Sequence, residues 1–576
     1  MTTIDLIDSA PPAEPQRPLS AGRERALRVR SLKGYESVDG TLLTEPRIEA
    51  IRRELQALLR CVQLESGGEP VEIDGFRLRD AANWADYPTS LSDIFWHLSS
   101  VCNFGCEFCY EKGNPAGFPI QNLTRMATLD EIKTRLAHYD PDKHTGVFTL
   151  RTSINEPFVN PRALEALRLL REKSSRELIS FVTNGSLLGE EIVAAMRDLR
   201  PIFFNLSMYS IDEQVRRTIL NDRRPDRAVR AVTLLREYEI PFMSNVVMWP
   251  SIPFDDLDRT VAFLEENRAT VVRVCLGGYS RYLEGNFERF EAKDFWPKVV
   301  EYVDRLRDRY RVPILIEPNA FVQTSTDAFI DGVVVDSPAD EAGLQRGDLV
   351  LAVDGRPVRS RTEMMSRVRR SRDAQRYRQP GVAAAAENGA ASKTGTVSLL
   401  VRRGERTFEV QLDRSLARSM SSYPYREIAA FNDFAYGLVV TDSLRFSSLL
   451  EARRLMEKHR AKRVLLLSSM LMEPVVSTML AKTDAFAGFD VSVRVPENRY
   501  FGGSINIGDL LVVSDFVAAV ESFRAEGGAD PDLVLIPASP FASSPWGRDL
   551  TGRPWLDIER NTGLPVALIP CPNLIY

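Results

Sequence analysis

Three of the chain's six cysteines lie in one short segment, Cys102-Asn-Phe-Gly-Cys106-Glu-Phe-Cys109. Three thiolates this close can ligate three irons of a cubane [4Fe–4S] cluster, and the fourth iron then has no protein ligand and can bind an exogenous group. Gly105 lets the loop wrap tightly around an inorganic core, because glycine tolerates backbone angles that other residues avoid. The spacing therefore predicts an iron–sulfur cluster with one open iron.

A structural zinc site is the main alternative for these cysteines, with His97 or a more distant group as the fourth ligand. Zinc knuckles usually pair two Cys-x2-Cys units, and the sequence contains no second pair. The remaining cysteines, Cys61, Cys275 and Cys571, are too few and too scattered to hold a second cluster. We therefore favour a single iron–sulfur cluster.

The cysteine segment follows the first of several apolar strands that alternate with helices. Such alternation predicts a parallel sheet. The pattern over residues 93–325 indicates an α/β fold, a partial (β/α)6 TIM-like barrel, which places its chemistry at the carboxyl ends of the strands. The predicted strands span residues 94–98, 146–150, 178–182, 202–208, 242–248 and 270–276.

At this spacing and position, the cysteine loop resembles the signature of the radical S-adenosylmethionine (radical SAM) superfamily. The resemblance implies that Cys102, Cys106 and Cys109 hold one [4Fe–4S] cluster, whose open iron chelates the amino and carboxylate groups of SAM. It also implies that an electron from the cluster cleaves SAM to a 5′-deoxyadenosyl radical, which abstracts hydrogen from a substrate. An external electron donor, a flavodoxin or a ferredoxin, is then required.

The same resemblance assigns SAM contacts to residues near the ends of the later strands. Glu156-Pro157 stands where the superfamily has a Gly-Gly-Glu-Pro-like motif, so Glu156 would accept hydrogen bonds from the SAM ammonium. Because the two glycines are absent, a simple helix start explains this Glu-Pro pair equally well. The other expected positions are Asn184 facing the site, Ser207 and Tyr209 at the ribose, Arg216 or Arg217 at the SAM carboxylate, Tyr110 near the adenine, Asn245 and Val274 as ribose and adenine neighbours, and Cys275 as a core residue or a hydrogen-atom donor.

A small β-rich module interrupts the α/β pattern over residues 326–415. Its segment 332–358 resembles a PDZ domain through Ser337-Pro-Ala, Ala342-Gly-Leu, Gly347-Asp and Val353-Asp-Gly. PDZ domains accept an extended peptide as an added strand, which implies a peptide or carrier-protein tail as a partner. The usual carboxylate-binding motif does not precede the first strand, so a scaffold without peptide binding is the alternative.

The 576 residues are enough for several domains. We predict a disordered tail over 1–30, a helical lead-in over 31–92, the barrel and the PDZ-like domain, and a C-terminal α/β domain over 416–576. The C-terminal part contains Asn498-Arg-Tyr-Phe-Gly-Gly-Ser-Ile-Asn-Ile. It resembles a region found with a PDZ module and a radical SAM barrel in bacterial proteins of unassigned function.

Charge and hydropathy argue against several function classes. The chain has 74 basic and 79 acidic residues, which disfavours a general nucleic-acid or anionic-membrane binder. A transmembrane run of about 18 apolar residues is absent, and the N-terminus lacks the basic start and apolar stretch of a signal peptide. We expect a cytoplasmic enzyme. Two other classes stay open: a zinc-stabilised PDZ scaffold, and a SAM-using transferase that keeps the SAM carbon skeleton in its product.

Overall fold

The computed structural model describes most of the chain from residue 98 onward and four very short strands before it. The described residues are 65–66, 69–70, 72–73, 76–77, 98–99, 101–115, 126–137, 148–150, 156–174, 178–285, 287–318, 325–373, 396–413, 432–441, 446–542 and 547–570. The chain divides into two compact units, one made of residues 90–136 and 144–446, the other containing residues 447–575. Among the described residues, no helix is both long and apolar enough to cross a bilayer.

Four two-residue strands lie within the predicted helical lead-in. They are β1 (Glu65–Ser66), β2 (Glu69–Pro70), β3 (Glu72–Ile73) and β4 (Phe76–Arg77). They form two antiparallel pairs, β1 with β2 and β3 with β4. The predicted tail over 1–30 and the rest of the lead-in lie outside the described residues.

The larger unit is built around a six-stranded parallel sheet. Its strands are β5 (Phe148–Leu150), β6 (Ile179–Thr183), β7 (Ile202–Ser207), β8 (Phe242–Met248), β9 (Val272–Leu276) and β10 (Ile314–Glu317). They lie side by side in the order in which they occur in the chain. The α/β fold with a partial barrel is thereby confirmed. The sequence pattern did not indicate β10, and nearly all of the strand predicted at 94–98 lies outside the described residues.

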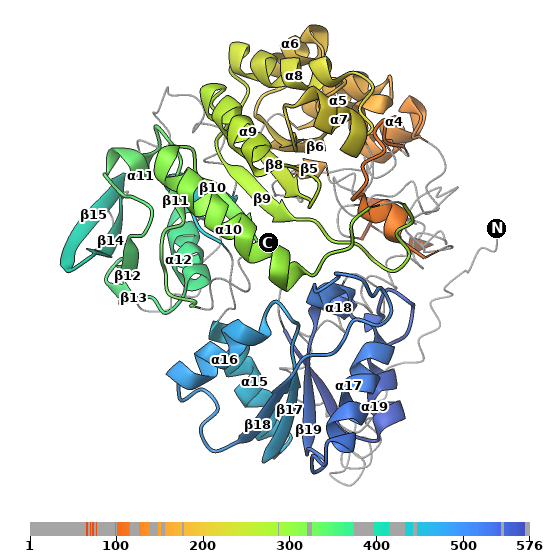
Figure 1. Ribbon diagram of the computed structural model, residues 1–576, viewed down its shortest axis with the longest axis vertical. Coiled ribbons are helices and arrows are strands. Elements are labelled where there is room, and N and C mark those ends of the chain that lie inside the picture. Colours follow the sequence, from red (N-terminus) through yellow and green to blue (C-terminus); the bar gives the residue numbers. More distant parts are fainter. Residues whose placement is uncertain are drawn as a thin grey trace. The chain divides into compact units, whose positions relative to one another are not determined.

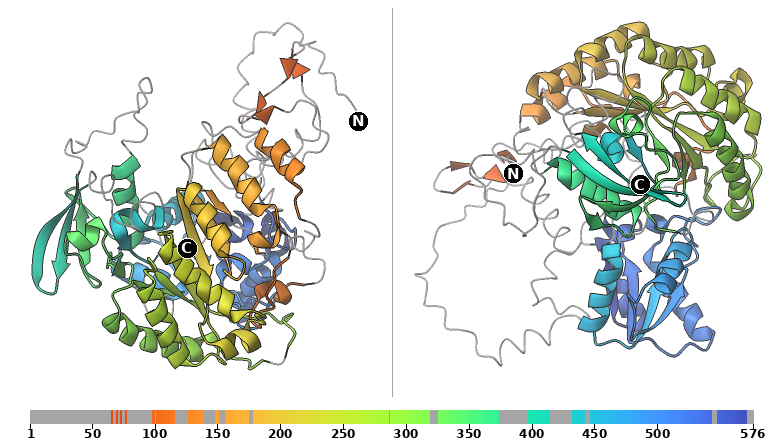
Figure 2. Two further views of the ribbon diagram at one scale, coloured as in Figure 1. Left: turned by 90° about the horizontal axis from the view of Figure 1, so that it is seen from above. Right: turned by 90° about the vertical axis from the view of Figure 1, so that its left-hand side faces the viewer.

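Helices connect these strands and cover one face of the sheet (Figure 1), and they form an arc around it in the right-hand view of Figure 2. Sequential parallel strands joined by right-handed crossovers carry all their helices on the same side. The helices are α4 (Leu129–Ala137), α5 (Ala163–Lys173), α6 (Glu190–Asp198), α7 (Glu213–Ile219), α8 (Pro225–Glu237), α9 (Phe254–Glu266) and α10 (Ala292–Arg309). In α10, Trp296, Val299, Val300, Val303 and Leu306 are buried at helical spacing. The other face of the sheet is the lumen of the barrel.

A cluster of buried apolar side chains closes the lumen at the amino ends of the strands. We call this cluster the barrel floor. The sheet contributes Leu178, Phe203, Met243, Val271 and Leu315, and two valines from outside the barrel, Val334 and Val439, complete it. The floor therefore lies at the opposite end of the strands from their carboxyl ends, where barrels of this kind carry their chemistry.

The two valines of the floor are supplied by the PDZ-like body. Its four-stranded antiparallel sheet has the order β13-β12-β14-β15. Its elements are α11 (Pro338–Glu341), β12 (Leu349–Val353), β13 (Arg356–Pro357), α12 (Arg361–Asp373), β14 (Thr396–Arg403) and β15 (Arg406–Asp413). A separate antiparallel pair joins β11 (Gly332–Val333) to β16 (Leu438–Val439), which follows the short helix η6 (Asn432–Gly437).

The PDZ-like body extends beyond the predicted boundary at residue 415. Ala435, Tyr436 and Leu438 are buried in the same core as the side chains of α12 and β14. At Gly437 the φ angle is 86°, and a Cβ atom there would collide with Ser337, so glycine is required for this close approach. The chain thus returns to complete the body after the β14–β15 hairpin, which a local sequence pattern does not reveal.

Strand β16 is shared between the PDZ-like body and the barrel. Leu438 lies in the PDZ-like core, whereas its neighbour Val439 lies in the barrel floor, as the alternation of side chains along a strand requires. An ion pair between Arg268 and Asp336 (3.0 Å) also joins the two bodies. Because this pair is exposed, it contributes at most about 1 kcal/mol, and the apolar floor is the main contact.

The second unit contains a four-stranded parallel sheet of order β18-β17-β19-β20. Its strands are β17 (Arg463–Leu467), β18 (Asp490–Arg494), β19 (Leu533–Pro537) and β20 (Val566–Ile569). Its helices are α15 (Phe446–Lys458), α16 (Glu473–Lys482), η7 (Gly508–Leu510), α17 (Val513–Ala525), α18 (Ser539–Ala542) and α19 (Leu556–Thr562). The α/β fold predicted for the C-terminal region is confirmed.

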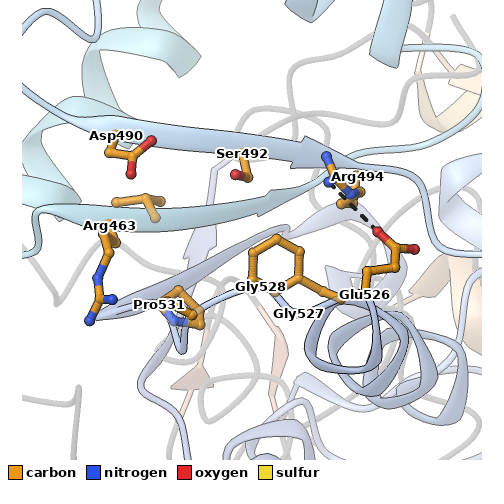
Figure 3. A pocket seen from close by; sticks show the side chains of 11 residues that line it. Arg463, Asp490, Ser492, Arg494, Glu526, Gly527, Gly528 and Pro531 are labelled. Carbon is orange, nitrogen blue, oxygen red and sulfur yellow. Dashed lines mark ion pairs between the residues drawn. The ribbon is translucent and has the colours of Figure 1, made fainter.

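A polar pocket of about 350 Å³ lies in this second unit, beside β17, β18 and the end of α17 (Figure 3). Arg463, Asp490, Arg494 and Glu526 line it. Arg494 and Glu526 approach to 3.7 Å, and Arg463 lies 3.9 Å from Asp532. Because both arginines are paired with carboxylates, the pocket has no excess of positive charge for an anionic ligand.

The barrel floor generates a stability prediction. Val439→Asp places a carboxylate in a cluster whose members are at most 5% exposed, so we expect a loss of about 3 kcal/mol or more in unfolding free energy. The control is Leu400→Asp, at a β14 position that is 39% exposed, where the change should be small. Denaturant unfolding of the whole chain measures both. Equal effects of the two substitutions would contradict the shared floor.

Candidate functional site

The cysteine loop, residues 102–109, is fastened to the turn that follows α7. The backbone N–H of Gly105 donates to the carbonyl of Leu220 (3.1 Å), and that of Glu107 donates to the carbonyl of Ile219 (2.8 Å). A Cβ atom on Gly105 would lie 2.7 Å from the side-chain amide of Asn221, so the loop and the turn approach closely. These contacts fix the loop's path independently of any bound group.

The three thiols of the loop lie close enough to influence one another. Burial, and then the proximity of Cys109 and Cys102, raises the pKa of the Cys106 thiol to about 12. Burial likewise raises the pKa of Cys102. Thiolates placed together in this way need compensating positive charge, which the irons of a cluster provide. Lys112 contributes a cation beside the loop, and its Nζ donates to the Cys106 carbonyl (2.8 Å).

The donor set fits an iron–sulfur cluster in its chemistry. Three sulfur atoms come from one loop, and polar hydrogens point at the first of them: the Phe104 N–H lies 3.4 Å and the Asn184 Nδ2 3.8 Å from the Cys102 Sγ. Such donors stabilise a thiolate ligand. Among the described residues, no three His, Cys, Asp or Glu side chains converge closely enough to hold a single metal ion. His97, the fourth ligand of the zinc alternative, lies outside the described residues.

Aromatic side chains wall off the inner side of the loop. Phe108, between the second and third cysteines, makes an edge contact with Tyr209 (5.2 Å between ring centroids) and packs against Trp249 (5.8 Å). Trp249 in turn packs against Tyr279 (6.4 Å). Gly277 lies directly against the Trp249 ring, where a Cβ atom would approach to 2.7 Å. The wall keeps the loop's inner side apolar.

Glu156 follows β5 in the chain and contacts residues at the end of β6. Its carboxylate accepts hydrogen bonds from the Thr183 hydroxyl (2.6 Å) and the Asn184 N–H (2.8 Å), and its own N–H donates to the Val101 carbonyl (3.3 Å). The side chain is 2% exposed. Burial raises the pKa of this carboxyl to about 7, although both hydrogen bonds oppose the shift. Glu156 therefore positions Asn184 next to the cysteine loop.

Asn184 is brought to the cysteine loop, as the sequence predicted for a residue that faces the site. Besides its contact with Cys102, its side-chain amide donates to Asn103 Oδ1 (2.9 Å). Asn103 donates to the Ser186 hydroxyl (2.8 Å), which donates back to Asn184 Oδ1 (2.7 Å). The sequence did not predict that Asn103 and Ser186 take part in this closed ring of polar groups. Only the folded turn after β6 brings Ser186 next to the cysteine loop.

The structure corrects the expectation for Arg216 and Arg217 as partners of the SAM carboxylate. Arg216 is fully buried, and its guanidinium donates to Asp222 (2.7 and 2.8 Å) and to the carbonyls of Met208 and Ser210 (2.8 and 2.9 Å). Arg217 pairs on the surface with Glu213. Arg216 is therefore a brace that connects the end of β7 with the turn that supports the cysteine loop.

The remaining predicted positions fall on both faces of the sheet. Ser207, Asn245 and Cys275 are partly exposed on the lumen face, whereas the side chain of Val274 is fully buried on the opposite face. Tyr209 follows β7 with a left-handed backbone (φ 54°) and donates its N–H to the Asn245 carbonyl (3.2 Å). Tyr110 begins the short helix η3 (Tyr110–Gly113) next to the last cysteine, and its side chain lies outside the described part.

Comparison with known proteins identifies two domains. Residues 96–264 match the radical SAM superfamily, and residues 329–373 match the PDZ domain. The chain therefore carries a radical SAM domain followed by a PDZ domain. Radical SAM domains use a [4Fe–4S] cluster together with SAM, and the cysteine loop falls inside the matched residues.

Individual relatives cover only part of the chain. It is 27% identical over 126 residues to a probable GTP 3′,8-cyclase of Sulfolobus acidocaldarius, which is 22% of this chain and 37% of that protein. A probable GTP 3′,8-cyclase of Sulfurisphaera tokodaii is 22% identical over 143 residues, 25% of this chain and 42% of that protein. The match thus spans less than half the length of these curated relatives.

Two solved structures also resemble part of the chain. Streptococcus suis SuiB is 17% identical with a TM-score of 0.30, over 38% of this chain and 46% of that chain. The structure of anSMEcpe with bound AdoMet is 14% identical with a TM-score of 0.31, over 41% of this chain and 68% of that chain.

The buried brace generates a second prediction. Asp222→Ala leaves the Arg216 guanidinium buried without its carboxylate, so we expect a loss of about 3–5 kcal/mol in unfolding free energy. The matched control is Glu213→Ala on the same helix, which breaks the exposed pair with Arg217 and should cost less than about 1 kcal/mol. Denaturant unfolding of the cluster-free protein measures both. Similar losses in the two variants would show that the buried pair stabilises the fold no more than the exposed pair does.

Glu156 generates a prediction about pH. Its folded pKa of about 7 lies above the ordinary value of 4.5, so its contribution to stability is complete below that value and is lost as the pH rises through 7. The loss amounts to roughly 3 kcal/mol, at about 1.4 kcal/mol for each pKa unit. Glu156→Gln, which cannot ionise, should remove this pH dependence from the unfolding of cluster-free protein between about pH 5 and 8. The same slope in variant and wild type would mean that Glu156 is already ionised at low pH.

Proposed function

We propose that this chain is a radical SAM enzyme in which Cys102, Cys106 and Cys109 hold one [4Fe–4S] cluster. The observation that carries the proposal is the braced loop on which three thiols, each close to the others, lie inside the residues that match the superfamily. When bound, the cluster and SAM supply a 5′-deoxyadenosyl radical that abstracts a hydrogen atom from the substrate. Reduction of the cluster requires an external donor, a flavodoxin or a ferredoxin.

The chain's own residues position and protect this centre. Asn184 directs its amide at the Cys102 sulfur, and Glu156 holds Asn184 in place. We assign Ser207 and Tyr209 to the ribose of SAM, because both lie at the carboxyl end of β7 on the lumen side. Tyr110, beside the last cysteine, is assigned to the adenine side. The aromatic wall around Trp249 keeps water from a radical formed there.

We propose that Cys275 is a packing residue that can also donate a hydrogen atom. Burial, and then the charge of Glu317, raises the pKa of its thiol to about 12, so the S–H bond is retained at neutral pH. A neutral thiol on the lumen face suits hydrogen-atom donation as well as packing. Its location on β9, in register with Glu317 of β10, supports the proposal that it lines the space in which the substrate reacts.

The PDZ domain is proposed to hold a peptide or a carrier-protein tail. The match of residues 329–373 to the PDZ domain supports this proposal, because PDZ domains take up an extended peptide as an added strand. The relatives named as GTP 3′,8-cyclases match too little of the chain to transfer their substrate. A cytoplasmic location suits an oxygen-sensitive cluster and an electron donor of this kind.

Anaerobic reconstitution tests the proposed function. Wild-type protein should bind iron and sulfide in equal amounts and, with dithionite and SAM, release 5′-deoxyadenosine. Cys106→Ala should lose most of its iron and reduce 5′-deoxyadenosine formation at least about a hundredfold, because one cluster ligand is removed. Cys61→Ala, which changes a cysteine far from the loop in sequence, is the control and should behave as wild type.

Other outcomes separate the alternatives. A protein that binds zinc only and shows no charge-transfer absorption after reconstitution would exclude the enzyme and favour the zinc-stabilised scaffold. A product that contains the SAM carbon skeleton, with no free 5′-deoxyadenosine, would instead assign the chain to the SAM-using transferases.

A further inference from the structure

The layer of side chains directly above the barrel floor is polar. Phe203, Met243, Val271 and Leu315 belong to the floor, and side chains two residues further along a strand point to the same face. Those positions are occupied by Asn205, Asn245, Arg273 and Glu317. We call these four residues the polar layer. Side chains that fill a barrel interior are usually branched and apolar, so this composition requires an explanation.

The lumen face is less tightly packed at this level than the helix-covered face of the same strands. Residues on the helix-covered face of β7 and β8 are buried, whereas Asn205, Ser207, Asn245 and Val247 on the lumen face are partly exposed. The side chains of Arg273 and Glu317 keep 12% and 22% of their surface exposed.

Two amide groups of the polar layer have unused hydrogen-bonding capacity. The Oδ1 atoms of Asn205 and Asn245 are buried and have no hydrogen-bond partner among the described residues. Leaving such an acceptor unsatisfied costs about 1–3 kcal/mol. An apolar side chain would avoid this cost, so these amides are more readily explained as groups that meet a ligand.

The charged members of the layer neutralise each other. Arg273 Nε donates to Glu317 Oε1 (2.9 Å), and a second hydrogen bond joins the Arg273 Nη2 to Oε2. The layer therefore offers a guanidinium donor, a carboxylate acceptor and two amide oxygens with no net charge. A polyanion such as a nucleoside triphosphate would bring charge that nothing in this layer compensates.

The polar layer lies next to the site already described. Ser207, Asn245 and Arg273 are register neighbours across β7, β8 and β9. Tyr209, two residues beyond Ser207, donates its N–H to the Asn245 carbonyl and packs its ring against Phe108 of the cysteine loop. A ligand held by the layer is thus on the lumen side of the cysteine loop.

We propose that the polar layer is the substrate-recognition site, and that it binds a net-neutral group with an N–H donor beside a carbonyl or carboxylate acceptor. An amide and a zwitterionic α-amino acid both have this chemistry: their N–H groups reach Glu317 and the asparagine oxygens, and their oxygen accepts from Arg273. The inference rests on the proposed function, because it identifies the class of substrate from which that centre takes hydrogen.

The test measures binding to the full-length, cluster-loaded protein in the presence of SAM. The probes are N-acetylalanine amide and its counterparts for the other amino acids, the free amino acids, and GTP. We expect at least one amide or amino acid to raise the thermal midpoint, as a ligand of the native state must, and GTP to have no effect. The two arms, amides and free amino acids, distinguish the two sources of the same chemistry.

Two variants are compared with the wild type. The first is the double substitution of Arg273→Gln with Glu317→Gln, which removes both charges together, and the second is Asn245→Leu. Each should weaken the Kd of the effective probe at least tenfold by equilibrium dialysis. The control is Arg309→Gln, which removes an exposed partner of Asp258 and should bind as wild type does. The midpoint without probe checks that every variant is folded.

Three results would overturn the inference: stabilisation by GTP alone, no stabilisation by any amide or amino acid, or unchanged probe affinity in both lumen variants. Release of 5′-deoxyadenosine by the wild type is scored separately. If the wild type makes 5′-deoxyadenosine but binds none of the neutral probes, the substrate class is wrong and the proposed function stands. If it makes none, the proposed function itself fails.

Discussion

Three thiols gathered on one short loop set the main constraint on this molecule, because as thiolates they repel one another. Burial raises the pKa values of Cys102 and Cys106, so without a compensating cation the loop favours neutral thiols over thiolates. Its backbone is held from outside by the turn after α7, and that turn is held by the buried pair of Arg216 and Asp222. The loop can therefore keep its shape without relying on the metal for it.

Much of the barrel could be predicted, because hydrophobic periodicity and the cysteine spacing are local signals. Five of the described strands, the cysteine loop and the place of Asn184 follow from short stretches of sequence. The role of Arg216 could not, since a buried arginine and a solvated one look alike until the position of Asp222 is known. The polar layer was missed for a similar reason: Asn205, Arg273 and Glu317 are far apart in sequence, and only the folding of β7, β9 and β10 into one sheet places them on the same face.

The lumen is organised as successive levels along the same strands. The apolar floor comes first, the polar layer lies two residues further on, and Ser207 and Cys275 are register neighbours of its members Asn245 and Glu317. Alternation along parallel strands makes such levels unavoidable, so the identity of a few residues decides what each level can do. Positions two residues apart on one strand therefore belong to different layers, the apolar floor and the polar layer.

The position of strand β16 limits how the PDZ-like module could be lost or replaced. Its partner β11 comes before the PDZ-like body, and β16 comes after the β14–β15 hairpin, so the body is enclosed between the two strands of one ladder. The last side chain of the barrel floor, Val439, is therefore encoded on the far side of the module from the barrel's strands. Loss of the module would remove Val334 and Val439 from the floor and expose the five side chains that the sheet contributes, and a replacement module would have to supply equivalent apolar side chains. The two domains thus share one apolar cluster and form one architectural unit, in contrast to domains joined end to end by a linker.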